Sequence, residues 1–396
     1  MSRILILGGG ALQVPLIQAA KRRGLETWVV DGSSKCPGRP LADHFRQIST
    51  VDTEAVVQLV EENNIDGVTT GATDKPMRVV GACVDRLNKP GPSLESTLAA
   101  TDKVLMAQVF STANVEQPDY WVGTCMNEFA DALQILKEST PLIVKPADSS
   151  GSRGVTLVTS LDAFESALSY AANASSSGTA IVQELLIGHE VSVEMLIDAE
   201  GIPHVVTITD KVTTGAPHFV ELGHRQPSAL PDSDLMRISD LATRASNSLG
   251  LKSCAGHCEI MMTPQGPKII EFGARFGGDF IGTDLVRLST GVDIANEVLS
   301  LALGHPINYA PTIQRGASVQ FSSLGTGTVK SIDGLTEARN TKGVETVGTF
   351  VEVGERTSGT SNSSQRGVYV IADGESAQEA YDSARKALLK IRISYV

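Results

Sequence analysis

Two glutamates in the second half of the chain have the spacing of a metal-binding pair. Glu259 and Glu271 lie in apolar stretches on either side of the turn sequence Thr263-Pro264-Gln265-Gly266-Pro267. A hairpin centred on Gln265 puts them directly opposite each other, with Cβ atoms about 5 Å apart. Carboxylates this close repel unless a cation lies between them, and a hard cation such as Mg²⁺ accepts their oxygens together with phosphate oxygens. The alternative is two solvated acids on an exposed sheet face.

Arg275 follows the second glutamate by four residues, in the Gly-rich segment 272–278. A guanidinium group can hold a phosphate or a carboxylate through two parallel hydrogen bonds. Gly277 and Gly278 would let the backbone approach such a ligand closely. An ordinary surface arginine is the alternative.

The segment Asp148–Gly154 combines two glycines with three serines between two predicted strands, Leu142–Lys145 and Val155–Val158. Its backbone N–H groups could fold over polyphosphate oxygens, and Lys145 and Arg153 would add positive charge. A solvated hairpin explains the composition equally well. The pattern G-x-x-x-x-G-K-[ST] does not occur, so this loop is not a P-loop.

A glycine-rich turn, Gly8-Gly9-Gly10, follows the first predicted strand, Ile4–Leu7. A dinucleotide fingerprint requires a third glycine where this chain has Gln13, although Asp31 lies near the position of the ribose-binding acid. A tight turn that binds no dinucleotide is therefore favoured over a nicotinamide site.

Composition narrows the classes of function. The chain has 396 residues, enough for two or three domains, and a net charge of -12, which argues against bulk nucleic-acid binding. It has no apolar run long enough for a membrane span. The five scattered cysteines suit a reducing cytoplasm; Cys254 and Cys258 flank His257, but no second Cys/His pair at ligand spacing completes a zinc site.

The predicted elements divide the chain into three parts. Residues 1–95 alternate strand and helix, which implies a parallel sheet, and the linker Lys89–Pro92 closes this α/β part. Residues 96–312 mix helices with antiparallel strands. Residues 313–396 form an α+β part with predicted strands at Val319–Phe321, Thr349–Val353 and Gly367–Ile371, a loop at Arg356–Arg366 and a helix at Ala377–Ile391.

Together these stretches resemble the ATP-grasp superfamily, and more narrowly its amide-forming members, the amino-acid ligases and carnosine-synthase-like enzymes. The resemblance covers essentially the whole chain. It implies a Rossmann-like pre-ATP-grasp domain, an ATP-grasp core of two subdomains with a mobile lid at about residues 115–183, and a small C-terminal α+β domain.

The resemblance also implies roles for individual residues, with ATP and Mg²⁺ (or Mn²⁺) as cofactors. Glu259 and Glu271 correspond to the metal carboxylates. Arg275, Lys145 and Lys211 correspond to catalytic side chains. The nucleotide would be bound by two lysines, the phosphate-covering loop, the adenine-binding hinge and a ribose-binding acid: Lys103, Lys145, Ser150, Gly151, Ser152, Arg153, Gly154, Gln183, Glu184, Leu186 and Glu190. The substrates would meet Glu221, His224, Arg225, Gly277 and Gly278.

One position departs from the superfamily pattern. Gly273 stands where an asparagine usually supplies an extra metal ligand, and amino-acid ligases also tend to have a small residue there. The implied reaction joins a small-molecule carboxylate to an amine through an acyl-phosphate and releases ADP and phosphate.

Several alternatives stay open at this point. The stretch 223–226 allows a purine-pathway enzyme that uses formate or bicarbonate. A nicotinamide-dependent oxidoreductase and an ATP-binding pseudoenzyme are further alternatives. No nucleic-acid or membrane partner is expected, and the chain could form a homodimer.

Overall fold

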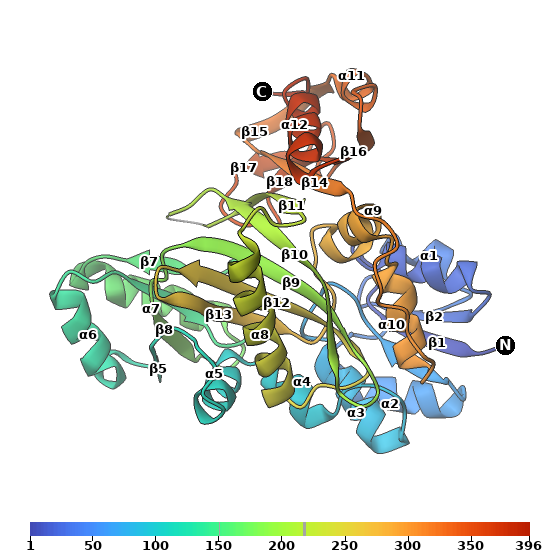
Figure 1. Cartoon of the computed structure of the whole chain (residues 1–396), viewed down its shortest axis with the longest axis horizontal. Coiled ribbons are helices and arrows are strands. Elements are labelled where there is room, and N and C mark those ends of the chain that lie inside the picture. The colour runs from blue at the N-terminus through green and yellow to red at the C-terminus, as the bar shows by residue number, and fades with distance from the viewer. Residues whose placement is uncertain (150, 217–218) are drawn as a thin grey trace.

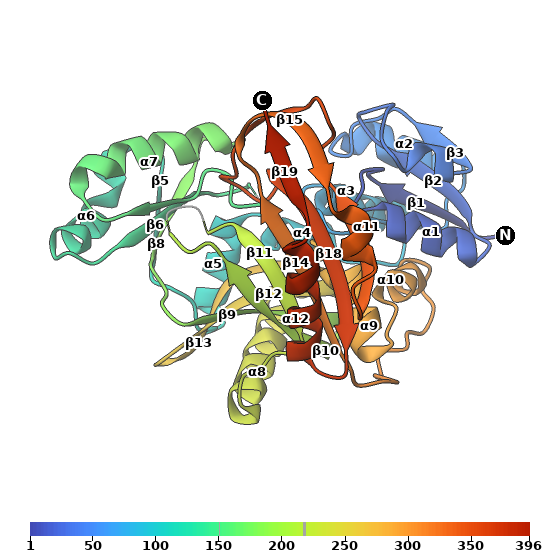
Figure 2. The ribbon, with the colours of Figure 1, turned by 90° about the horizontal axis from the view of Figure 1, so that it is seen from above.

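The computed structural model describes residues 1–149, 151–216 and 219–396. Within these ranges, no helix is both long enough and apolar enough to cross a membrane. The large central sheet has the N-terminal sheet on one side and a smaller antiparallel unit on the other (Figures 1 and 2).

The N-terminal part is a parallel four-stranded sheet in the order β3-β2-β1-β4, as the alternating pattern predicts. Helix α10 from the middle of the chain packs beside α1, and their apolar side chains share one core with this sheet. The elements are β1 (Arg3–Leu7), α1 (Val14–Arg22), β2 (Glu26–Val30), η1 (Arg39–Leu41), β3 (His44–Arg46), α2 (Thr53–Glu62), β4 (Gly67–Thr69), α3 (Met77–Leu87) and α10 (Ile294–Ala302).

A second four-stranded sheet, in the order β5-β8-β6-β7, is antiparallel. Its helices cover it with a core of their own, in which Phe129 and Phe164 meet edge to face. The elements are β5 (Tyr120–Gly123), η2 (Met126–Phe129), α6 (Ala130–Lys137), β6 (Leu142–Pro146), β7 (Thr156–Val158), α7 (Leu161–Ala174) and β8 (Ala180–Glu184).

The central sheet has eight strands in the order β13-β12-β9-β10-β11-β14-β18-β16. Helix α8 packs against β12 and β13, and α4 and α5 link this part to the N-terminal sheet. The elements are α4 (Leu94–Ala99), α5 (Lys103–Thr112), β9 (His189–Ile197), β10 (Pro203–Thr213), β11 (Glu221–Gln226), α8 (Asp232–Ser248), β12 (Cys254–Thr263), β13 (Gly266–Gly273), η3 (Ile281–Leu285) and α9 (Val286–Thr290).

The C-terminal part continues the central sheet, because β14 pairs with β11. Its elements are β14 (Gly316–Ser323), β15 (Thr326–Asp333), α11 (Leu335–Arg339), β16 (Val344–Thr349), β17 (Arg356–Ser358), β18 (Arg366–Gly374), α12 (Ala377–Leu388) and β19 (Arg392–Tyr395). The predicted strand Thr349–Val353 is wrong. Pairing with β18 begins at Val344 and ends at Thr349, after which the chain turns. The predicted loop from Arg356 contains a short strand, β17, which pairs with β15.

Candidate active site

Glu259 and Glu271 are cross-strand partners on β12 and β13, so the predicted pairing is confirmed. The turn differs from the prediction, because Thr263 pairs with Gly266 and the hairpin is centred between Pro264 and Gln265. A bulge between Glu259 and its neighbour corrects the register by one residue. Without this bulge Glu259 would pair one residue away from Glu271, and a one-residue slip turns side chains to opposite faces.

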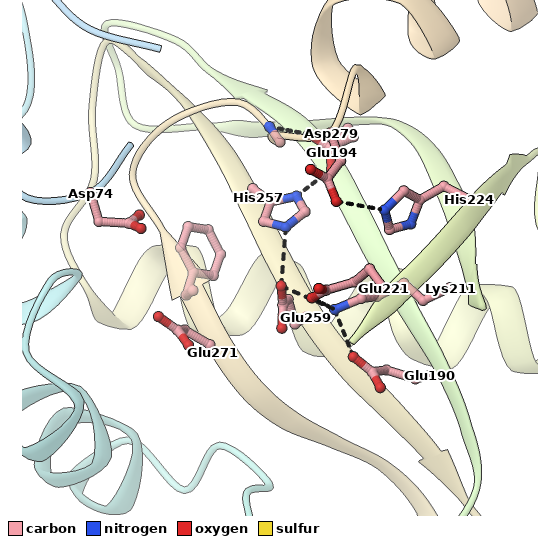
Figure 3. Close-up of polar contacts among 12 residues, drawn as sticks. Asp74, Glu190, Glu194, Lys211, Glu221, His224, His257, Glu259, Glu271 and Asp279 are labelled. Atoms are coloured by element: carbon pink, nitrogen blue, oxygen red, sulfur yellow. Dashed lines mark hydrogen bonds and ion pairs between the residues drawn. The ribbon is translucent and has the colours of Figure 1, made fainter. Parts of the chain in front are cut away.

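Two lysines neutralise the glutamate pair. Lys211 of β10 places its Nζ 3.2 Å from Glu259 Oε1, 2.7 Å from Glu190 and 3.8 Å from Glu221 (Figure 3). Burial opposes its charge, but the three carboxylates outweigh burial and raise the pKa of Lys211 well above its usual range. Lys103, at the start of α5, lies 3.0 Å from Glu271.

The glutamate pair suits a hard divalent cation. Both carboxylates supply oxygen donors to one cavity, and both side chains are about one-quarter exposed. Among the described residues no cluster of three or more His, Cys, Asp and Glu side chains could hold a metal alone. Phosphate and water oxygens would therefore have to complete the coordination. Cys254 and Cys258 are buried thiols whose pKa values burial raises.

A cavity of about 200 Å³ lies between the central sheet and the four-stranded sheet β5-β8-β6-β7, and most of the predicted nucleotide-binding side chains line it. Lys145 projects into it from β6, and Glu184 at its wall is paired with Lys268 at 2.8 Å. The predicted residues that line it are Lys103, Lys145, Gly151, Ser152, Arg153, Gln183, Glu184, Leu186 and Glu190. Gly154 instead turns the chain at φ +79°, packed against Ala174 and Pro146. Ser150 lies outside the described residues.

A second cavity, of about 350 Å³, contains predicted substrate residues. Glu221, His224 and Gly278 line it. The two cavities share a wall made of Gly151, Arg153, Lys211, Glu221, Glu259 and Arg275. A ligand in either cavity can therefore reach the same charged side chains.

Arg225 and Gly277 do not reach these cavities. Successive side chains of a strand point to opposite faces, so Arg225 points away from the side that His224 faces. Its Nε is 2.9 Å from Asp210 Oδ2, and its guanidinium lies over the ring of Tyr381. Gly277 lies behind the site, where its N–H donates to Glu194.

A buried chain of contacts behind Glu259 was not predicted from the sequence. Glu194 contacts Nδ1 of His257, and Nε2 of His257 lies 3.4 Å from Glu259 (Figure 3). Burial lowers the pKa of His257, but Glu194 outweighs it and raises the value to about 9. The position of His257 two residues before Glu259, on the same face of a strand, was a usable signal.

Three more charged residues were missed, all on segments distant in the sequence. Asp74, on the loop after β4, contacts Arg275. Asp279 lies between His224 and Arg366 of β18, and these two residues line the second cavity. The loop after a parallel strand is a common place for functional residues, which was the only signal for Asp74.

Side chains of the N-terminal domain itself occupy the space beside the turn Gly8-Gly9-Gly10. The Gln13 side chain lies against Gly8 and Gly10, and its Nε2 donates to the Gly71 carbonyl at 2.6 Å. The Gly9 N–H donates to Asp31. The glycine-rich turn and Asp31, which resemble parts of a dinucleotide fingerprint, are thus both engaged in contacts within the domain.

Three protein families match successive parts of the chain. They are the ribonucleotide synthetase preATP-grasp domain over residues 1–82, the ATP-grasp domain over residues 138–284 and the L-amino acid ligase C-terminal domain 2 over residues 320–396.

Individual proteins are also similar to much of the chain. The uncharacterized protein y4rH of Sinorhizobium fredii is 28% identical over 357 residues, which cover 87% of this chain and 73% of that protein. The alanine–anticapsin ligase of Bacillus subtilis is 29% identical over 283 residues, which cover 65% of this chain and 58% of that protein. A phosphoribosylamine–glycine ligase is among the similar proteins as well.

The fold also matches a solved structure. The L-amino acid ligase from Bacillus licheniformis superposes with a TM-score of 0.86 at 22% identity, covering 100% of this chain and 99% of that one. The chain thus has an ATP-grasp domain, with a pre-ATP-grasp domain before it and an L-amino acid ligase C-terminal domain 2 after it, and it is similar to ATP-grasp carboxylate–amine ligases.

Proposed function

We propose that the chain joins the carboxylate of an amino acid or a related small acid to an amine through an acyl-phosphate, and releases ADP and phosphate. The observation that carries the proposal is the wall shared by the two cavities, which includes Lys211, Glu259 and Arg275. A nucleotide in the first cavity and an acid in the second would meet at this wall. Holding two reactants in contact accounts for much of the rate in such transfers.

In the first cavity, Lys103 and Lys145 would bind phosphates, and residues 151–154 would cover them. The hinge residues Gln183, Glu184 and Leu186 would hold the adenine, and Glu190 the ribose. Glu259 and Glu271 would hold Mg²⁺, or Mn²⁺ in its place. When bound, the metal neutralises phosphate charge and so favours attack at the terminal phosphorus.

At the shared wall, Arg275 would bind the transferred phosphoryl group or the acid, and Lys211 would balance the charge that develops beside it. In the second cavity, Glu221 would attract the positively charged amine. His224 is buried and its Nδ1 has no hydrogen-bond partner among the described residues, which favours a polar ligand atom there.

We also propose that the chain is divided into three domains. Residues 1–95 form the pre-ATP-grasp domain, 96–312 the catalytic core with a mobile lid at about 115–183, and 313–396 the C-terminal domain. Five free cysteines support a reducing cytoplasmic location. A homodimer is compatible with this arrangement.

The test is an incubation of the chain with ATP, Mg²⁺ and pooled pairs of amino acids. We expect phosphate release that depends on both substrates, a condensation product by mass spectrometry, and ADP as the nucleotide product by chromatography. AMP and pyrophosphate as the main products would overturn the acyl-phosphate route. Phosphate release that depends instead on formate or bicarbonate would favour the purine-pathway type.

A further inference from the structure

We propose that Asp74, on a loop of the N-terminal domain, is a positioning residue that holds the Arg275 guanidinium at the wall between the two cavities. The inference rests on the proposed function, because it assigns Asp74 a task in that reaction. It also gives the N-terminal domain a direct part in the active site.

The contact between the two side chains fixes an orientation. Arg275 Nε lies 2.9 Å from Asp74 Oδ1, and Arg275 Nη2 lies 3.3 Å from Asp74 Oδ2. Each side chain is only 13% exposed. Two roughly parallel hydrogen bonds between planar groups restrain rotation as well as position. The third guanidinium nitrogen, Nη1, is 3.3 Å from the Phe276 carbonyl oxygen.

Gly273 leaves the space that this ion pair needs. A Cβ atom at position 273 would lie 2.9 Å from Asp74 Oδ1 and 3.2 Å from Nε and Cζ of Arg275. A residue with a side chain would therefore displace the carboxylate or the guanidinium. The need to accommodate Asp74 therefore explains why position 273 is glycine here, where the superfamily pattern has asparagine.

Gln13 and the sheet hold the loop that carries Asp74. The Gln13 amide donates to the Gly71 carbonyl at 2.6 Å, and the Thr70 hydroxyl donates to the Leu7 carbonyl at 2.7 Å. The backbone of Ala72 adopts φ +58°, a left-handed conformation that residues other than glycine rarely adopt. Such strain persists only where the surroundings impose it, and it is common next to functional sites.

Arg275 has two competing acidic neighbours. Burial lowers its pKa, but carboxylates outweigh burial and raise it overall, with Asp74 contributing more than Glu259 or Glu271. Without Asp74, the strongest remaining attraction would draw the guanidinium toward the two proposed metal ligands. Asp74 therefore keeps Arg275 available for the phosphoryl group or the acid.

A double-mutant cycle tests the inference. The variants are Asp74→Asn, Arg275→Met and the double variant, and Asp66→Asn, an exposed acid of the same domain, is the control. Phosphate release would give kcat and the KM for ATP, and thermal unfolding without nucleotide would report on the ion pair itself.

We expect Asp74→Asn to lower kcat by roughly 10- to 100-fold, the usual cost of removing a group that orients another. The KM for ATP should change by less than about two-fold, because a positioning role acts on the transferred group. In the Arg275→Met background the same substitution should change kcat by less than about two-fold. Each single variant should melt at a lower temperature than the double variant, since each leaves one buried charge alone.

Several results would overturn the inference. One is wild-type kcat in Asp74→Asn. Another is that Asp74→Asn lowers kcat as strongly in the Arg275→Met background as in the wild type, which would mean that Asp74 acts on something else. A third is additive losses of melting temperature. A wild-type chain without ligase activity would instead contradict the proposed function, while the melting temperatures would still show whether the two residues are coupled.

Discussion

Glu259 and Glu271 lie directly opposite each other on β12 and β13, and their charges are balanced by two different lysines, Lys211 and Lys103. The sequence suggests that the pair repels itself in the absence of metal. The structure shows instead that each carboxylate has a cationic partner from another segment, so the metal-free site is electrostatically satisfied. This arrangement changes what substitutions at the site should do.

Replacing Glu271 with glutamine should remove most ligase activity, by roughly 10²–10³-fold at saturating ATP, because one ionic ligand for the proposed metal is lost. Stability without metal should fall by about 1 kcal/mol, since Lys103 loses its ion-pair partner and keeps only its hydrogen bond to the Ser149 carbonyl. Phosphate release and thermal unfolding measure the two effects. The exposed Glu345→Gln is the matched control. Near-normal turnover of Glu271→Gln would contradict the proposal that the two glutamates bind the metal.

Replacing Lys211 with methionine should destabilise the metal-free chain by about 3 kcal/mol or more. Lys211 is 4% exposed and touches three carboxylates, which would be left close together without a cation. Added Mg²⁺ should raise the melting temperature of this variant by more than it raises that of the wild type, because a cation would then relieve repulsion. Thermal unfolding with and without MgCl₂ checks this, with the exposed Lys330→Met as control. An unchanged melting temperature would contradict it.

The sequence predicts local features of this protein well. The alternation of strand and helix in the first 95 residues is correct in type and order because both periodicities are local. The pairing of Glu259 with Glu271 is also correct, but two errors cancelled: the turn is centred half a residue earlier than predicted, and a bulge restores the register. Bulges of this kind have no reliable sequence signal.

Features that depend on distant segments could not be predicted in the same way. Arg225 looked equivalent to His224, yet only one of two neighbouring strand residues can face the site, and the sequence does not say which. Asp74 lies 201 residues from Arg275 in the chain, and no local pattern joins them. The same holds for Asp279 and Arg366, which meet through the pairing of the C-terminal strands with the central sheet.

Asp210 makes a prediction about acid stability. It is buried on β10, and although burial would raise its pKa, hydrogen bonds led by the one to His189 lower the value from 3.8 to about 2. A carboxyl group with a lowered folded-state pKa stabilises the fold above its unfolded value, and this stability is lost as pH falls through the folded one. The wild type should therefore lose about 2 kcal/mol between pH 4 and pH 2 from this group. Asp210→Asn should lack this component, which urea unfolding across that pH range would detect. Identical pH profiles for both proteins would contradict the assignment.

Lys145 makes a prediction about nucleotide binding. It is 6% exposed, and burial together with the like charge of Lys103 lowers its pKa from 10.5 to about 8. At pH 8 about half of the molecules should therefore hold a neutral Lys145. Phosphate oxygens beside this amine favour its charged form, so ATP binding should raise the pKa again. Binding at pH 8 should then take up roughly half a proton, and affinity should weaken as pH rises further.

Calorimetry of ATP binding in two buffers with different ionisation enthalpies measures this proton uptake directly. Lys145→Arg is the matched variant, because arginine stays charged throughout this pH range. It should bind ATP without proton uptake near pH 8, and its affinity should depend less on pH than that of the wild type. Lys145→Met should lose both the uptake and much of the affinity, since only Lys103 of the two proposed phosphate-binding lysines then remains. If the wild type takes up no proton at pH 8, then Lys145 either stays fully charged in the empty cavity or does not meet the phosphates. In either case its proposed role in nucleotide binding would have to be revised.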